Sequence, residues 1–209
     1  QFALLALGAA QDRGIKIDPL VFQRAHRYWT KRQQANGGWA YGSGRRTSGS
    51  MTCAGIASVI IAGSRLDSDA AGNRIQCCGG STTDEQAIEN GIQWLGRNFT
   101  LQVNPGGDSM TKFYYLYALE RVGRLSGRRF IGDHDWYREG AEYLIGIQDE
   151  FQGYWSNVGA MESSNVATSF ALLFLSKGKR QVVAGRLQYG SLEVQAQWNQ
   201  HPDGLRQLV

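Results

Sequence analysis

The sequence predicts an all-α protein built from repeated pairs of helices, and three observations lead to this fold class. First, a Gln–Gly–Trp turn occurs twice, within residues 33–41 and 148–155. Second, segments that are apolar on all sides alternate along the chain with amphipathic segments. Third, no Asn-Gly or Asp-Gly hairpin joins two alternating runs, so no strand signal competes. A spaced motif that recurs with helices on both sides indicates a repeat architecture.

The alternation predicts two layers of helices. Helices that are apolar all round are expected to begin at residues 1, 51, 110 and 166, and such helices must be buried. Amphipathic helices are expected to begin near residues 19, 84 and 135, because their apolar residues recur with the 3.6-residue period. Buried helices that alternate with half-buried ones indicate an inner layer and an outer layer.

Local signals support several helix starts. Asp18 before Pro19 predicts an N-cap followed by proline in the first turn. Thr83 with Gln86 three residues later is typical of a capping box. The tripeptide Ser-Met-Thr opens the helix at residue 50 and recurs at residue 109, before the next inner helix. The polar stretch 66–80 is predicted as a loop, which is long for a compact domain and therefore functional or an insertion.

The pattern divides the chain into two regions. Residues 1–177 are predicted to form the repeat region, and residues 178–209, where the alternation is lost, a linker toward a further C-terminal domain. The chain begins inside a helix-like segment without Met, so we expect a fragment of a longer protein. Neither a secretion signal nor an apolar run of about 18 residues is found, so no membrane span is expected. The compartment stays open between cytoplasm and cell envelope.

The positive net charge of the chain does not by itself predict nucleic-acid binding. The net charge is +4 and the isoelectric point is about 9.1. The clusters of adjacent basic residues at 45–46, 128–129 and 177–180 lie in turns or at helix ends. A nucleic-acid interface needs basic residues gathered on one face with aromatic residues between them. We therefore expect these clusters to be solvated turns.

The two turns resemble the QW motifs of squalene and terpenoid cyclases and of protein prenyltransferase subunits. The residues that carry the resemblance are Gln33, Gly37 and Trp39 in the first turn and Gln148, Gly153 and Trp155 in the second. These families share an α/α-toroid, so the resemblance implies a toroid over about residues 1–177. Seven helices give fewer pairs than a closed ring of this type has, so the ring is expected to be incomplete. Trp39 and Trp155 are predicted to be structural, stacking on the next repeat while Gln caps neighbouring backbone.

The chain also looks like a group of large uncharacterised bacterial proteins. These proteins join a prenyltransferase- and squalene-cyclase-like repeat region to a C-terminal domain of unknown function, DUF4159. The likeness lies in residues 1–7, 50–55, 135–137, 140–142 and 170–175. It implies a bacterial origin, a fold and a neighbouring domain, whereas that group has no established activity.

The catalytic acid of the cyclases has only a partial counterpart in this sequence. The families protonate an alkene with an Asp-x-Asp-Asp motif in an apolar cavity, and the nearest match, residues 133–136, ends in Trp. Asp133 and Asp135 stand before an outer helix, where Asp caps exposed N–H groups. The alternative is that Asp133, His134 and Asp135 line a cavity, with His134 as an oriented base.

The zinc site of the prenyltransferases is not predicted either. That site uses Asp, Cys and His, with Asp two residues before Cys, and none of the cysteines at positions 53, 77 and 78 has this neighbour. The histidines at 26, 134 and 201 are far apart, whereas zinc needs three or four ligands together. No metal and no cofactor are expected. Cys53 is predicted to be a small buried side chain, and Cys77 and Cys78 receive no role.

The aromatic inner helix offers further candidates. Tyr114 and Tyr117 are candidates for lining a cavity, where ring faces stabilise cations. Three functions remain open from these observations. The first is a non-catalytic binding or scaffold domain of a larger protein, with a protein partner or an apolar ligand. The second is an enzyme acting on isoprenoid-like substrates, and the third is a polysaccharide-active toroid domain, whose aromatic residues would stack on sugars.

Overall fold

A computed structural model describes residues 1–42, 44–70, 82–107, 109–156 and 161–176. All of them belong to one compact unit, Gln1–Gly178. The expectations for the linker 178–209, for most of the loop 66–80 and for Cys77 and Cys78 lie outside the described residues.

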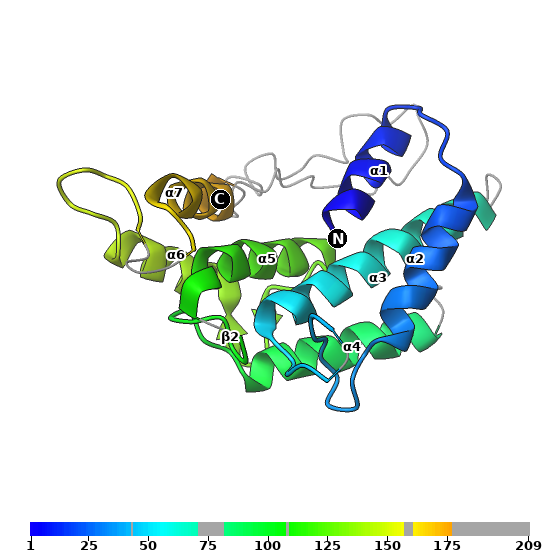
Figure 1. The fold of residues 1–209 in the computed structure, drawn as a ribbon, viewed down its shortest axis with the longest axis horizontal. Coiled ribbons are helices and arrows are strands. Elements are labelled where there is room, and N and C mark those ends of the chain that lie inside the picture. The colour runs from blue at the N-terminus through cyan, green and yellow to red at the C-terminus, as the bar shows by residue number, and fades with distance from the viewer. Residues whose placement is uncertain (43, 71–81, 108, 157–160, 177–209) are drawn as a thin grey trace, which may run out of the picture. The chain divides into compact units, whose positions relative to one another are not determined.

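The described chain is all-α apart from one short hairpin, which confirms the predicted class (Figure 1). A 3-10 turn, η1 (Ser109–Thr111), leads into one of the helices. The helices are α1 (Phe2–Asp12), α2 (Pro19–Lys31), α3 (Gly49–Ala70), α4 (Thr82–Arg97), α5 (Lys112–Leu125), α6 (Trp136–Gly146) and α7 (Ser164–Ser176).

Helices α3 and α5 form the centre of the described unit. Helix α3 packs against α1, α2, α4 and α5, and α5 packs in turn against α6 and α7 (Figure 1). Both central helices bury side chains on most of their surface: α3 is apolar nearly all round, whereas α5 is of mixed composition and buries Glu120 and Arg121 as well. The amphipathic helix α2 instead buries one side chain fully, Phe22, and leaves its polar face in solvent.

Helices α1 and α7 are less buried than the sequence predicts. In α1 only Leu4 and Gly8 are buried, and in α7 the side chain of Leu172 is 53% exposed. The other described helices cover only one side of α1 and of α7, so part of the apolar surface of each is exposed.

The structure also corrects three local expectations. Helix α3 runs to Ala70, so the segment expected to be a loop from residue 66 begins as helix. An antiparallel hairpin of β1 (Phe130–Ile131) and β2 (His134–Asp135) was not predicted, because two-residue strands are too short to show alternation. The second Ser-Met-Thr does not open its helix: it forms η1, and α5 starts after it at Lys112.

Helix α3 is long and apolar enough to pass a test for a membrane span. The window Gly49–Leu66 has a mean hydropathy of 1.2, and 67% of it is buried inside the protein. The sequence was expected to contain no apolar run of about 18 residues, and this 18-residue window contradicts that expectation. Burial of most of the window is typical of a core helix, so the finding is weak evidence for a membrane span.

Candidate functional site

The two Gln–Gly–Trp turns make the same hydrogen bonds at two places in the fold. The indole Nε1 of Trp39 donates to the carbonyl of Trp29, and that of Trp155 donates to the carbonyl of Leu144, each at 2.8 Å. Each acceptor stands four positions before the Gln of its turn. The tryptophan side chain therefore ties the turn to the end of the preceding outer helix.

The backbone of each tryptophan is held by the following inner helix. The N–H of Trp39 donates to Oγ1 of Thr52 at 3.1 Å, and the N–H of Trp155 donates to Oγ1 of Thr168 at 3.0 Å. Thr168 is thus the structural counterpart of Thr52, although the letters around the two threonines differ. The repeat is more regular in its contacts than in its sequence.

The glutamine of each turn closes the turn on itself. Gln33 Nε2 donates to the Gly37 carbonyl at 2.8 Å, and Gln148 Nε2 donates to the Gly153 carbonyl at 2.7 Å. Gln33 Nε2 also donates to the Ala87 carbonyl of α4 at 2.7 Å, which links one outer helix to the next. All six motif residues thus take part in contacts that hold the turns.

The N-termini of the central helices are capped from the loops that precede the next inner helix. Asn104 Oδ1 accepts from the N–H of Ser50 at the start of α3, at 2.9 Å. The carboxylate of Glu162 accepts from the N–H groups of Phe113 and Tyr114 at the start of α5, at 3.0 and 2.7 Å. The first N–H groups of a helix have no acceptor within the helix, so these side chains supply one. The carboxylate of Glu162 is also stabilised by the positive end of the helix dipole.

The two buried carboxylates of the described chain both have a partner. Glu162 caps α5 as above, and Glu120, 1% exposed, lies 3.7 Å from the Nε of Arg124 on the same helix. Each therefore has a structural task.

Tyr114 and Tyr117 lie together in an aromatic cluster on the inner helices, which we call the inner cluster. It consists of Phe2 from α1, Tyr114 and Tyr117 from α5 and Phe170 from α7. The ring of Tyr117 stacks on that of Phe170, with centroids 5.3 Å apart. Burial raises the pKa of the Tyr114 hydroxyl, which accepts a hydrogen bond from Gln1 Nε2 at 2.6 Å.

Arg121 lies beneath this cluster and is only 6% exposed. Its guanidinium carbon is 4.3 Å from the ring centroid of Tyr117 and 5.1 Å from that of Phe2. Nη1 donates a long bond of 3.5 Å to the side-chain oxygen of Gln1, and the buried Nη2 has no hydrogen-bond partner. Within the described residues, this buried cation has two ring faces and an amide around it but no carboxylate.

Asp133, His134 and Asp135 are not part of the inner cluster. They belong to the hairpin and the start of α6, where Asp135 accepts from the N–H of Arg138 at 3.4 Å as an N-cap. His134 stacks on Phe99 and its Nδ1 lies 2.9 Å from a carboxylate oxygen of Glu139. An open pocket of about 410 Å³ is lined by Asp133 and His134 together with Gln93, Gly96, Arg97 and Gly132. The sequence grouped these residues with the tyrosines, whereas the fold separates the two sets.

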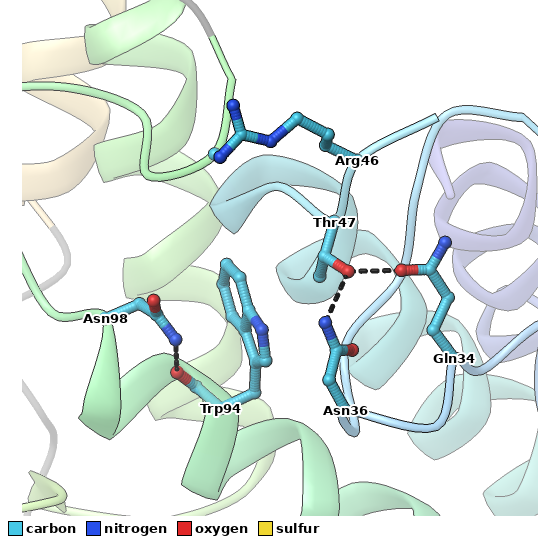
Figure 2. Close-up of a pocket in the computed structure, with 7 residues that line it drawn as sticks. Gln34, Asn36, Arg46, Thr47, Trp94 and Asn98 are labelled. Carbon is cyan, nitrogen blue, oxygen red and sulfur yellow. Dashed lines mark hydrogen bonds between the residues drawn. The ribbon is translucent and has the colours of Figure 1, made fainter. Parts of the chain in front are cut away.

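A further pocket of about 420 Å³ lies beside the first Gln–Gly–Trp turn (Figure 2). Trp94 stands between Asn98 and the pair Asn36 and Thr47, while Arg46 extends from the loop above it. Thr47 donates to Gln34 and accepts from Asn36 Nδ2, so the polar groups of the wall largely bind one another. These hydrogen bonds stabilise the first Gln–Gly–Trp turn, so the same polar groups are not free to bind a ligand in the pocket.

Comparisons with known protein families, with curated proteins and with solved structures find no match for this chain. The site must therefore be judged on its own geometry. Among the described residues, no group of three or more His, Cys, Asp or Glu side chains is placed to hold a metal ion.

Sequence reasoning missed Arg121 and Phe170. Arg121 stands three residues before another arginine on a helix of mixed composition, and nothing in that pattern marks it as buried. A helical projection could have given a signal, because residues 114, 117 and 121 fall on one helix face at spacings of three and four.

Proposed function

We propose that residues 1–177 form part of an α/α-toroid-like repeat that works as a binding domain of a larger protein. Its ligand has an apolar body and an acidic group, and it binds at the inner cluster. The equivalent contacts of the two Gln–Gly–Trp turns support a repeat of helix pairs. The toroid and the relationship to the QW-motif families and the DUF4159 group rest on the resemblance of the sequence. The ligand is inferred from Arg121.

The buried guanidinium of Arg121 is the observation that carries the proposal. Burying a charged group without a paired opposite charge costs several kcal/mol, so buried cations in proteins are normally paired. Arg121 has two aromatic faces and a neutral amide instead, and its Nη2 has no partner. A carboxylate, sulfonate or phosphate group of a ligand would supply the missing anion through a charge-assisted hydrogen bond.

The surroundings of Arg121 suit the apolar part of such a ligand. Phe2 is 51% exposed and Tyr114, Tyr117 and Phe170 are half-buried, so their rings still offer apolar surface. Aromatic side chains provide large apolar contact with few rotamers to fix. The binding hypothesis is preferred to the two enzymatic hypotheses because both buried carboxylates, Glu120 and Glu162, already have structural partners.

The proposal is tested with a matched pair of ligands, laurate and lauryl alcohol, which share the apolar chain and differ in the acidic group. Calorimetric titration should show that laurate binds the chain about tenfold or more tighter than the alcohol, the range expected for a hydrogen bond to a charged group. Arg121→Gln should remove this difference, and Arg138→Gln, which changes an exposed arginine of α6 paired with the exposed Glu142, should keep it.

Arg121→Met distinguishes a ligand anchor from a structural arginine. If the ligand-free protein holds Arg121 without an anion, an apolar side chain of similar length should keep or raise the melting temperature. A clear loss of stability in Arg121→Met, or equal binding of laurate and alcohol, would reject the proposal.

A further inference from the structure

The solvent face of α2 carries a basic surface that the sequence analysis did not identify. We call it the α2 basic face, and it consists of Arg24, Arg27, Tyr28, Lys31 and Arg32. Lys31 and Arg32 are adjacent in the chain, whereas Arg24 and Arg27 stand apart from them and from each other. Residues 24, 27 and 31 are spaced by three and four positions, so they become neighbours only when the segment is a helix.

The cations of this face have no acidic partners among the described residues. None of the ion pairs found there includes Arg24, Arg27, Lys31 or Arg32. Helix α2 contains no acidic residue, and the two acidic side chains of the described chain that bind it are engaged elsewhere on it: Asp18 caps its N-terminus, and Asp84 of α4 pairs with His26. Four like charges on one helix face repel one another, so an anionic partner would stabilise them.

The face also has shape and apolar surface. Its five side chains surround a shallow hollow of about 360 Å³, and the guanidinium of Arg32 lies 4.7 Å from the ring centroid of Tyr28. Tyr28 is 50% exposed, and Leu20 and Val21 at the start of the helix are 49% and 39% exposed. Cations, an aromatic ring and aliphatic side chains thus share one exposed surface.

We propose that the α2 basic face docks an acidic peptide segment of a partner protein, in which carboxylates alternate with apolar side chains. Three of the four cations are arginines, whose planar guanidinium matches a carboxylate in a bidentate arrangement. The apolar residues of the peptide complement Leu20, Val21 and Tyr28, which the backbone of a nucleic acid does not. A flat lipid surface would meet only the tips of the side chains, whereas a peptide side chain enters the hollow.

The test uses a fluorescein-labelled helical peptide that carries glutamates at spacings of three and four with leucines between them, and a matched peptide with glutamine in place of glutamate. Fluorescence anisotropy should show that the glutamate peptide binds the 209-residue chain about tenfold or more tighter than the glutamine peptide. This preference should weaken as salt is added, because the charges lie at the surface.

Two charge-reversal variants locate the binding surface. Arg24→Glu with Arg27→Glu should abolish the preference for the glutamate peptide. Arg45→Glu with Arg46→Glu makes the same change in net charge, but on an exposed loop outside α2, and should leave the preference intact. Circular dichroism verifies that both variants fold, and Arg24→Gln with Arg27→Gln, which removes the charges without reversing them, should weaken binding in the same direction.

Three results would overturn this inference. The first is equal affinity for the two peptides, and the second is an unchanged preference in the folded Arg24→Glu, Arg27→Glu protein. The third is displacement of the peptide by phosphatidylglycerol vesicles or duplex DNA at lower concentration of anionic groups than the unlabelled peptide needs. That result would assign the face to a membrane or a nucleic acid instead.

Discussion

At the scale of single residues, each Gln–Gly–Trp turn contains a glycine in a backbone conformation that other residues rarely adopt. Gly37 and Gly153 both have positive φ, +92° and +69°, a region that side chains with a Cβ rarely adopt. The two glycines differ in their surroundings. A Cβ on Gly37 would meet the Asn90 carbonyl oxygen at 2.5 Å, whereas one on Gly153 would find its nearest neighbour, Gln148 Nε2, at 3.8 Å.

We therefore expect Gly37→Ala to destabilise the protein more than Gly153→Ala. The strained backbone should cost about 1–2 kcal/mol in each variant, and the contact with the backbone of α4 should add about 1–3 kcal/mol in Gly37→Ala. Urea unfolding of the two variants beside the unsubstituted protein measures the difference. Equal losses would mean that Asn90 moves away freely.

Cys53 illustrates a residue whose chemistry is set by packing. The side chain is fully buried in α3, and burial raises the pKa of its thiol well above the ordinary value. Only the thiolate is a nucleophile, so the native protein keeps this cysteine unreactive.

Iodoacetamide should therefore modify Cys53 only after unfolding. Peptide mapping by mass spectrometry should show alkylation of the Cys53 peptide roughly several thousandfold or more slower in the native state than in urea, since a typical opening costs at least about 5 kcal/mol. Mapping separates this cysteine from Cys77 and Cys78. Fast native alkylation would indicate that α3 opens locally.

At the scale of elements, the inner helices are coupled through their N-termini. The start of α3 is capped by Asn104 from the loop before α5, and the start of α5 by Glu162 from the loop before α7. Each inner helix thus depends on the chain that leads into the next one. This coupling joins neighbouring repeats independently of the hydrophobic contacts between them.

Removing the Glu162 cap should destabilise the protein through α5. Glu162→Ala leaves the buried N–H of Phe113 and the half-buried N–H of Tyr114 without an acceptor, for which we expect a loss of about 1–3 kcal/mol. Glu162→Gln keeps one acceptor and should lose less, while Glu150→Ala, an exposed glutamate in the turn before α7, should change little. Thermal unfolding followed by circular dichroism gives the three values. A loss in Glu162→Ala no larger than in Glu150→Ala would contradict the capping role.

At the scale of the whole molecule, several buried groups make stability sensitive to alkaline pH. Burial raises the pKa of Cys53, Tyr114, Tyr115 and Tyr137 in the folded state. A group whose pKa is raised by folding keeps its proton in the folded state at a pH where the unfolded state releases it. Stability is therefore constant below the unfolded pKa values, about 8.5 for Cys and about 10 for Tyr, and falls as pH rises above them.

The urea midpoint should accordingly decrease between pH 8 and pH 11, a window set by those unfolded values. Tyr115→Phe removes the most deeply buried of these hydroxyls and should make the decrease smaller, whereas Tyr41→Phe, an 81% exposed tyrosine, should leave it unchanged. A midpoint that does not change over this range would show that the buried groups release their protons as readily in the folded state as in the unfolded one.

The all-α class and the order of the helices can be predicted from the sequence alone. Asp18 and Pro19 mark the start of α2 as predicted, and the alternation of apolar and amphipathic segments placed all seven helices of the described chain, because both signals are local. The sequence also identified the two Gln–Gly–Trp turns as equivalent, since the spacing of the motif is a property of the chain.

Which residues share a site, in contrast, follows from the fold. It separated Asp133 and His134 from Tyr114 and Tyr117, and it buried Arg121 under rings from α1 and α5. It likewise showed Thr168, and not a repeated tripeptide, to be the counterpart of Thr52. Some of these groupings join residues about a hundred positions apart, and others join residues on one face of a helix. Patterns among neighbouring residues in the sequence therefore do not predict them.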